Sequence, residues 1–528
     1  MKAPVGMPPE ATRRLSHECK GIHQRKQTSL APARIGINTR YAKRGWSGRV
    51  PRKNGIVGAP MVHRPPIAYT RKGEPLLNKE FTVDVLVIGW GKAGKTIAGR
   101  LAAEGRKVAL VERSAQMYGG SCINIACVPT KDLIDSASKR DGRDPVSYFT
   151  SAVADRDTLI ATLNRTNHAM LEGKVLLLDG VASFTGPHTV KAVGGDDEIT
   201  VQAETIIVNT GSHSATLPVP GADGPRVHDS TTIQHVDPLP SQLVIVGGGF
   251  IGLEFAQMFA RFGSQVTLLE AGETFAPALD ADIAERVRNM LEGEGVTVVT
   301  GAQVTSCDET GGHVDVVTDD QTFAADVVLV AAGRRPATED LDLAAAGVAT
   351  DERGYITVDD QLRTNIDGVY AVGDVNGGPQ FTYISLDDNR VLWDTLHDGP
   401  RRRDDRVAVP ATTFLDPPLS QVGMTMRQAR ESGRSVLVAT KDVATIAAMP
   451  RPKIVGQTEG VIRVLVDADD HTVLGATLWC IDSQELVNFV SLAMRLGVRY
   501  ETLRDGIWTH PSSTEAFNEV LGVLEPLT

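Results

Sequence analysis

Two cysteines lie close together in the chain, at a spacing that could support redox chemistry. Cys122 and Cys127 stand in the run GGSCINIACVPTK, separated by four residues. At the start of a helix this spacing can bring two sulfurs together, and the positive end of the helix dipole lowers the pKa of a thiol. A metal site is the alternative, but residues 115–145 contain no histidine and no third cysteine. The pattern predicts a redox pair and no metal centre.

A glycine-rich turn upstream predicts a first dinucleotide site. Gly89, Gly91 and Gly94 form the pattern G-x-G-x-x-G between a strand-like run and a helical run. The first glycine allows a tight turn, the second lets the backbone approach a pyrophosphate, and the third allows close helix–strand packing. Glu112 ends the next predicted strand, where its carboxylate can accept hydrogen bonds from ribose hydroxyls. A single turn of this kind is weak evidence, because glycines also serve ordinary turns.

The same design recurs later in the chain. Gly247, Gly249 and Gly252 repeat the pattern, and Glu270 follows them at the spacing that separates Glu112 from Gly89. Two such units suggest a flavin together with a nicotinamide cofactor, and they argue against an inert cysteine pair. A carboxylate at Glu270 would repel a 2′-phosphate, and no arginine follows it directly. We therefore expect NADH, with NADPH as the alternative.

Composition bounds the class of protein. The chain has 528 residues, 42% of them hydrophobic, which predicts roughly two to four domains. No apolar run approaches the about 20 residues of a membrane-spanning helix, so no membrane association is expected. Five cysteines do not make a disulfide scaffold, and a cytoplasmic location is expected. Residues 1–80 are basic and without apolar period, and are predicted to be a disordered tail. The acidic remainder argues against nucleic acid as a partner of the core.

Hydrophobic periodicity predicts an α/β fold. Strands over 83–88 and 107–112 flank a helix over 95–104. The second unit repeats this with strands over 242–246 and 265–270 and a helix over 252–262. Short strand-like runs between and after the units suit three-layer α/β domains.

A charged stretch rich in Arg and Asp, with Gly399 and Pro400, marks a boundary over 398–405. Beyond it, strands and helices alternate, which predicts a compact α+β domain. The expected strands span 460–466 and 473–478, and the expected helices span 484–496 and 513–524.

The two glycine loops and the cysteine motif together resemble the class I pyridine nucleotide–disulfide oxidoreductases, which include glutathione reductase, dihydrolipoamide dehydrogenase and mercuric reductase. The resemblance covers about residues 81–528. The stretches GWGKAGKTIA, CINIACVPTK and GDVNGGPQFTYISLDD most resemble the bacterial reactive-chlorine-resistance reductases, which act as hypothiocyanous acid reductases.

The resemblance implies a role for each thiol. Cys127 would lie against the flavin of FAD as the charge-transfer thiolate, and Cys122 would be the interchange thiol that meets substrate. His510 matches the acid/base residue that the other subunit of a homodimer supplies, with Glu515 orienting its ring. An imidazole of near-neutral pKa suits proton exchange with a thiol. The structural alternative is a capping box, in which Ser512 and Glu515 begin the following helix.

Further cofactor contacts follow from the same resemblance. Asp374, after Gly373, matches the carboxylate that accepts from a ribityl hydroxyl of FAD. Lys131 and Glu254 match an ion pair near flavin N5. For the residues alone, a capped turn and ordinary helix-surface charge are the alternatives.

The implied fold is two Rossmann-like dinucleotide-binding domains, the second inserted into the first, and an α+β interface domain. Gly211 and Gly333 match motifs where the chain crosses between the nucleotide domains. The expected domains are an FAD-binding domain (81–220 and 345–400), an NAD(P)-binding domain (221–344) and a dimerisation domain (401–528).

The expected function is transfer of electrons from NAD(P)H through FAD and a disulfide of Cys122 and Cys127 to a small oxidant, hypothiocyanous acid or a related reactive species. Mercuric reductase-like and dihydrolipoamide dehydrogenase-like activities are the alternatives. Against the first, no vicinal cysteine pair ends the chain, whose last cysteine is Cys480. Against the second, Thr509 stands before His510 where those enzymes have His-x-His-Pro. A more distant alternative is a non-catalytic flavoprotein that binds a partner through its basic head.

Overall fold

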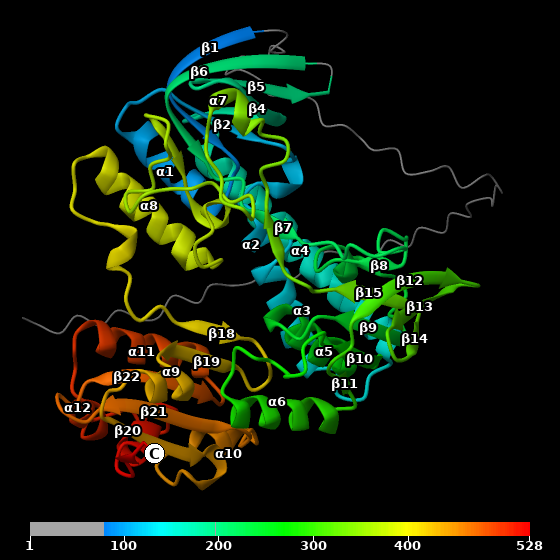
Figure 1. The fold of residues 1–528 in the computed structure, drawn as a ribbon, viewed down its shortest axis with the longest axis vertical. Coiled ribbons are helices and arrows are strands. Elements are labelled where there is room, and N and C mark those ends of the chain that lie inside the picture. The colour runs from blue at the N-terminus through cyan, green and yellow to red at the C-terminus, as the bar shows by residue number, and fades with distance from the viewer. Residues whose placement is uncertain (1–78, 196, 528) are drawn as a thin grey trace, which may run out of the picture. The chain divides into compact units, whose positions relative to one another are not determined.

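The computed structural model describes residues 79–195 and 197–527 (Figure 1). The basic tail expected over 1–80 lies outside these residues, except for Lys79 and Glu80, which begin strand β1 (Lys79–Ile88). Within the described part of the chain, no helix is both long enough and apolar enough to cross a bilayer.

The first sheet has seven strands and carries the first glycine loop at its carboxyl edge. Val85 and Val87 on β1 pack against the helices of one face, and Leu86 and Ile88 pack into the core on the other. Both faces are covered, which is why β1 is a nearly continuous apolar run. Helices α1 (Lys92–Ala103) and α8 (Thr382–Leu396) cover one face (Figure 1). Around β1 lie β2 (Val108–Glu112), β3 (Leu176–Asp179), β4 (Val181–Gly186), β5 (Thr189–Gly194), β6 (Asp197–Val208) and β17 (Val369–Ala371).

The second sheet is wholly parallel and repeats the design. Leu243 and Ile245 on β9 (Gln242–Val246) face one core, and Val244 and Val246 face the other. The expected strand over 242–246 is thus confirmed, and α5 (Phe250–Phe262) begins two residues before the predicted helix. The other strands are β8 (Val227–His228), β10 (Gln265–Leu269), β11 (Thr297–Val299) and β15 (Val327–Val330), and an antiparallel sheet of β12 (Val304–Thr310), β13 (His313–Thr318) and β14 (Thr322–Ala325) lies beside them.

Two short strands join the sheets. β7 (Ser212–Ser214) and β16 (Arg334–Pro336) pair antiparallel where the chain leaves the first sheet and where it returns. The Arg334 guanidinium donates to the Ser212 hydroxyl at 2.9 Å and to its carbonyl at 2.7 Å. These bonds hold the two chain crossings together beside Gly373 and Asp374, which we call the second flavin motif.

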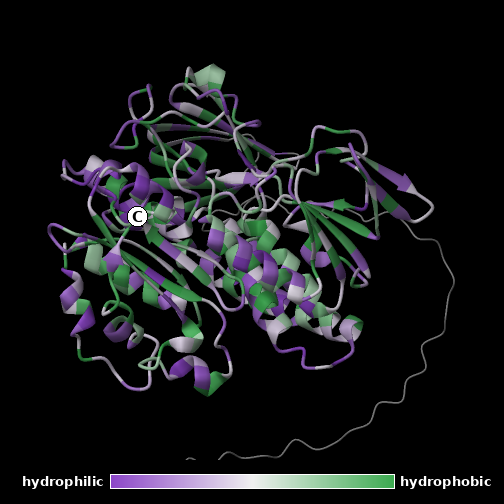
Figure 2. Ribbon diagram, turned by 60° about the horizontal axis from the view of Figure 1, so that its bottom comes forward, coloured by the Kyte–Doolittle hydropathy of each residue, from purple (hydrophilic) through white to green (hydrophobic). Residues whose placement is uncertain are grey.

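The last sheet is antiparallel and six-stranded. Its two central strands, β21 (Val461–Asp467) and β22 (Val473–Trp479), are buried throughout and confirm the expected strands. Hydrophobic residues, green in Figure 2, run along the strands of the sheets. The remaining strands are β18 (Ala411–Thr413), β19 (Leu419–Gly423), β20 (Val436–Asp442) and β23 (Glu525–Pro526).

The expected helices of this region differ in how well they match. α11 (Ser483–Arg495) is confirmed, but the helix predicted over 513–524 is wrong in length, because α13 spans only Ala516–Val520. At its start, the Ser513 hydroxyl donates to Asp482 at 2.7 Å and the chain is held outside the helix. At its end, Gly522 favours termination, and the chain then pairs with β20 as β23.

Candidate active site

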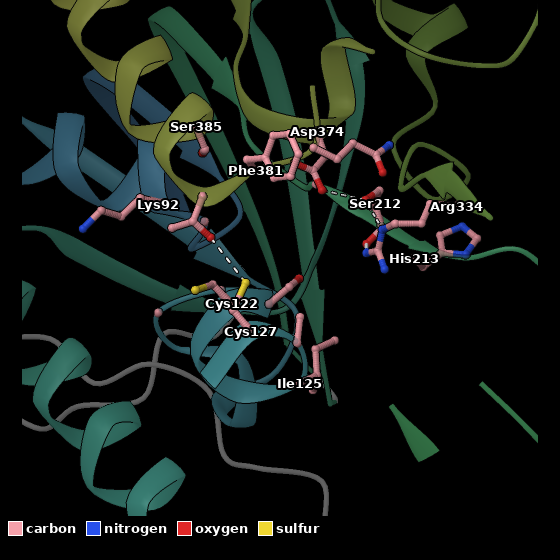
Figure 3. Close-up of a pocket in the computed structure, with 18 of the residues that line it drawn as sticks. Lys92, Cys122, Ile125, Cys127, Ser212, His213, Arg334, Asp374, Phe381 and Ser385 are labelled. Carbon is pink, nitrogen blue, oxygen red and sulfur yellow. Dashed lines mark hydrogen bonds between the residues drawn. The ribbon is translucent and has the colours of Figure 1, made fainter. Parts of the chain in front are cut away.

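One large cavity gathers half of the predicted site residues, including both cysteines. It encloses about 1040 Å³ and is lined by parts of both nucleotide-binding sheets and of the C-terminal domain (Figure 3). The predicted residues in its wall are Gly89, Gly91, Glu112, Cys122, Cys127, Lys131, Gly211, Glu254 and Asp374. The predicted residues outside its wall are Gly94, Gly247, Gly249, Gly252, Glu270, Gly333, Gly373, His510 and Glu515.

The two cysteines lie at consecutive helix starts. Cys122 is the second residue of α2 (Ser121–Asn124) and Cys127 the first of α3 (Cys127–Ser138). Both are free thiols here. A hydrogen bond from the Cys122 thiol lowers the pKa of Cys127 to about 6, although burial opposes this shift. The same bond raises the pKa of Cys122. At neutral pH the pair therefore holds one proton, on Cys122, and one thiolate, on Cys127.

The Cys127 thiolate has two further supports. Its sulfur lies 3.7 Å from the hydroxyl of Thr382, the first residue of α8 (Figure 3). Lys131, one turn along α3, also lowers the pKa of Cys127 by its charge. The Lys131 ammonium donates to Glu254 at 2.7 Å, and the other oxygen of this buried carboxylate accepts from the Phe414 backbone at 2.8 Å. The ion pair thereby joins α3, which begins at Cys127, to α5 of the second nucleotide-binding domain and to the C-terminal domain.

The first glycine loop is held by an asparagine that the sequence interpretation did not single out. Gly94 N donates to the Asn209 side-chain oxygen at 2.8 Å, and the Asn209 amide donates to the Val372 carbonyl at 2.7 Å. Gly89 has φ of +96°, and a Cβ there would lie 2.5 Å from the Asn209 carbonyl oxygen. At Gly91 a Cβ would lie 2.4 Å from the Asn209 side-chain oxygen. Asn209 begins the crossing motif Asn209-Thr210-Gly211, and its place in this motif was the only sequence signal for its role.

Two carboxylates complete a dinucleotide cradle. Glu112 accepts from Trp90 N at 2.9 Å and from Ser114 N at 3.2 Å, and burial raises its pKa to about 7. Asp374 accepts from the Ser212 hydroxyl at 2.7 Å (Figure 3). The positive dipole end of α1 lies beside them and suits a pyrophosphate, although Ala93 N and Gly94 N donate to Ser385 and Asn209. These acceptors fit the ribose and ribityl hydroxyls of FAD.

The second glycine loop fits a second dinucleotide. A Cβ at Gly252 would lie 1.9 Å from the Gly247 carbonyl oxygen, so helix and strand can meet only with glycine. Around Gly249 a Cβ would meet nothing within 4 Å, so this position leaves room for a ligand. Glu270 accepts from Gly248 N at 2.9 Å, which places its carboxylate beside the loop.

The second flavin motif rests on a buried ion pair. Gly373, at φ +73°, donates its N–H to Asp388 at 2.7 Å, and Asp388 pairs in turn with Arg406. Asp388 ends the stretch GDVNGGPQFTYISLDD, but neither its bond to Gly373 nor its pairing with Arg406 was predicted, because a contact between the charged linker and α8 leaves no local pattern. Gly211 (φ +77°) and Gly333 (φ +118°) take left-handed conformations at the two crossings.

His510 and Glu515 lie together but apart from the thiols of the same chain. The ring nitrogen Nδ1 of His510 is 2.8 Å from Glu515 Oε1, and the His510 side chain is 72% exposed. Glu515 also accepts from Ser512 N at 2.8 Å, as a capping box requires. The Ser512 hydroxyl has no partner, so only half of the capping box forms.

Comparison with known proteins agrees with this geometry. Residues 83–388 match the pyridine nucleotide-disulphide oxidoreductase family, and residues 409–521 match its dimerisation domain. The chain is 42% identical over 444 residues to the probable pyridine nucleotide-disulfide oxidoreductase RclA of Escherichia coli strain K12, covering 83% of this chain and 99% of that protein. It is 33% identical over 455 residues to dihydrolipoyl dehydrogenase 2 of Haloarcula marismortui, covering 83% and 95%.

A solved structure gives the same relationship. The HOCl-induced flavoprotein disulfide reductase RclA from Escherichia coli superposes with a TM-score of 0.79 at 42% identity, covering 83% of this chain and 99% of that chain. The expected fold class is confirmed, and the dimerisation domain supports a homodimer. The chain belongs to the pyridine nucleotide-disulphide oxidoreductase family and is an NAD(P)H-dependent flavin disulfide reductase.

Proposed function

We propose that this enzyme reduces small reactive oxidants, and that hypothiocyanous acid is its substrate. The observation that carries the proposal is the pair of free thiols, Cys122 and Cys127, which lie at consecutive helix starts in the wall of the large cavity. The likeness to a reductase that is induced by hypochlorous acid supports the same class of substrate. Five cysteines in 528 residues do not make a disulfide scaffold, so we place the enzyme in the cytoplasm.

The thiols would act in sequence. Hypothiocyanous acid would reach the site as its anion, hypothiocyanite, and take up a proton there. Deprotonated Cys122 attacks the sulfur of the protonated acid, the S–O bond breaks, and the hydroxide that leaves is protonated to water. The Cys127 thiolate then attacks the Cys122 sulfur and displaces thiocyanate, which leaves a disulfide between the two cysteines. FAD bound in the cavity supplies the electron pair from NAD(P)H that returns this disulfide to two thiols.

The proton exchange needs an acid/base group close to Cys122. We propose that His510 of the partner subunit supplies it, since this histidine is exposed and its ring is fixed by Glu515. A charged imidazole can protonate the hydroxide, and the neutral ring can later accept the thiol proton. The complete site then exists only in the homodimer.

NADH is the proposed electron donor. The Glu270 carboxylate accepts from Gly248 N and also from Gly272 N, both at 2.9 Å, where the ribose of the nicotinamide cofactor would bind. A second negative charge, such as the 2′-phosphate of NADPH, would be repelled there.

The test is steady-state NADH oxidation by holoenzyme with hypothiocyanite, Hg(II) or lipoamide as oxidant. We expect the largest kcat/KM with hypothiocyanite, and we expect Cys122→Ser to abolish that turnover while NADH still bleaches the flavin. A larger kcat/KM with Hg(II) or lipoamide would refute the proposed substrate.

A further inference from the structure

A smaller cavity lies on the α1 side of the helix that carries Cys122. It encloses about 430 Å³ between α1, Ile123 of α2, and helix α4 (Pro145–Leu171). Lys92 and Lys95, one turn apart on α1, both line it. Lys92 also borders the larger cavity, and its side chain points away from the two sulfurs (Figure 3).

Lys95 is fixed against the segment that leads to Cys122. Its ammonium donates to the Gly119 carbonyl at 3.3 Å and to the Asn167 side-chain oxygen at 2.5 Å. Both partners are neutral, and no carboxylate of residues 79–195 and 197–527 forms an ion pair with Lys92 or Lys95. In contrast, the charge of Lys131 is matched by Glu254.

Lys95 lies beside the segment that holds Cys122, since its ammonium is bonded to Gly119, three residues before Cys122, and since it lines the smaller cavity together with Ile123, the residue after Cys122. Burial and the neighbouring Lys92 together lower the pKa of Lys95 to about 8, against the opposing effect of Cys122. Lys95 in turn lowers the pKa of Cys122, against the larger upward effect of the hydrogen bond to Cys127. At pH 7 Lys95 therefore keeps its charge, and that charge is felt at the interchange thiol.

We propose that Lys95 determines substrate specificity, because its ammonium group, whose two hydrogen-bond partners are both neutral, holds a positive potential at Cys122 that favours anionic oxidants over neutral and cationic ones. Lys95 is a positioning residue, since it acts on the substrate through the field at the thiol. The choice of hypothiocyanite as the anion rests on the proposed function, but the charge at Cys122 does not.

The potential at Cys122 can be measured without turnover. Holoenzyme reduced by NADH is alkylated at low ionic strength with iodoacetate, which is an anion, or with iodoacetamide, which is neutral, and peptide mapping follows Cys122. The ratio of the two rates reports the local potential. Removing a unit charge at this range should lower the ratio about three- to tenfold.

Two variants remove the charge in different ways. Lys95→Gln keeps an amide donor for the Gly119 carbonyl, and Asn167→Asp keeps Lys95 but gives it a carboxylate partner. Lys107→Gln is the matched control, because Lys107 is an exposed lysine that directly precedes β2, at the end of this strand away from Glu112. We expect both site variants to lower the alkylation ratio, and to lower kcat/KM for hypothiocyanite more than kcat/KM for the neutral 2-hydroxyethyl disulfide.

The outcomes separate the two proposals. A ratio that stays at the wild-type value in both Lys95→Gln and Asn167→Asp overturns the charge inference, as does an equal loss of rate with the neutral disulfide. A lowered ratio in an enzyme that does not turn over hypothiocyanite supports the charge inference and refutes the proposed substrate.

Discussion

Replacing Asn209 by alanine should loosen the FAD-binding loop. The substitution removes the acceptor of Gly94 N and the donor to the Val372 carbonyl, at 2.8 and 2.7 Å, in a site where Asn209 is 4% exposed. Each buried backbone group left without a partner costs about 1–3 kcal/mol. Alanine also removes the cost of burying the asparagine amide, which offsets part of the cost of these two unpaired groups. We therefore expect the free energy of unfolding to fall by about 3 kcal/mol.

The assay pairs urea unfolding of the protein without FAD with an FAD titration. Because Gly91 approaches the same side chain, the loop should lose its shape, and FAD affinity should fall at least about tenfold. Asn365→Ala is the matched control. Asn365 also accepts from one backbone N–H (Ala349) and donates to one carbonyl (Gly347), both at 2.8 Å, but at an exposed site where water can replace it. Equal effects of the two substitutions would refute the reasoning.

Three other predictions concern the thiols and the nicotinamide site. In Cys122→Ser the hydroxyl can still donate to Cys127, so the rate of Cys127 alkylation by iodoacetamide should titrate near pH 6, with the thiolate lost as the pH falls. Cys122→Ala removes this hydrogen bond and should raise the midpoint of the titration. The same midpoint in both variants would contradict the assigned hydrogen bond. Glu254→Gln removes a negative charge that raises the pKa of Cys127, so the same titration should shift to lower pH, and an upward shift would contradict the assignment. Glu270→Ala should reduce the preference for NADH over NADPH about tenfold in kcat/KM, and an unaltered ratio would show that Glu270 does not set it.

Local patterns predicted the parts of the fold that depend on short stretches of chain. Glycines at fixed offsets from a strand impose one backbone path, so Gly89 and Gly247 identified two nucleotide-binding turns, and both take left-handed conformations in the structure. Short, nearly continuous apolar runs likewise predicted β9, β21 and β22, which are buried on both faces.

Features that depend on distant partners could not be predicted in this way. The charged stretch over 398–405 was interpreted as a boundary, yet Arg401 within it and Arg406 just after it pair with Asp387 of α8. The loop of Cys122 and Cys127 contains no basic residue, but Lys95 reaches the start of this loop from α1, where it donates to the Gly119 carbonyl. Helix α13 ends earlier than predicted because the chain after it pairs with β20 as the edge strand β23.

The central claim is that electrons from NADH reach Cys122 and Cys127. The most direct measurement is anaerobic titration of the oxidised holoenzyme with NADH, followed by alkylation and mass spectrometry of the peptide that holds both cysteines. We expect two free thiols in this peptide after the titration with NADH and none before it. A flavin that bleaches while these two sulfurs keep the same state throughout would contradict it.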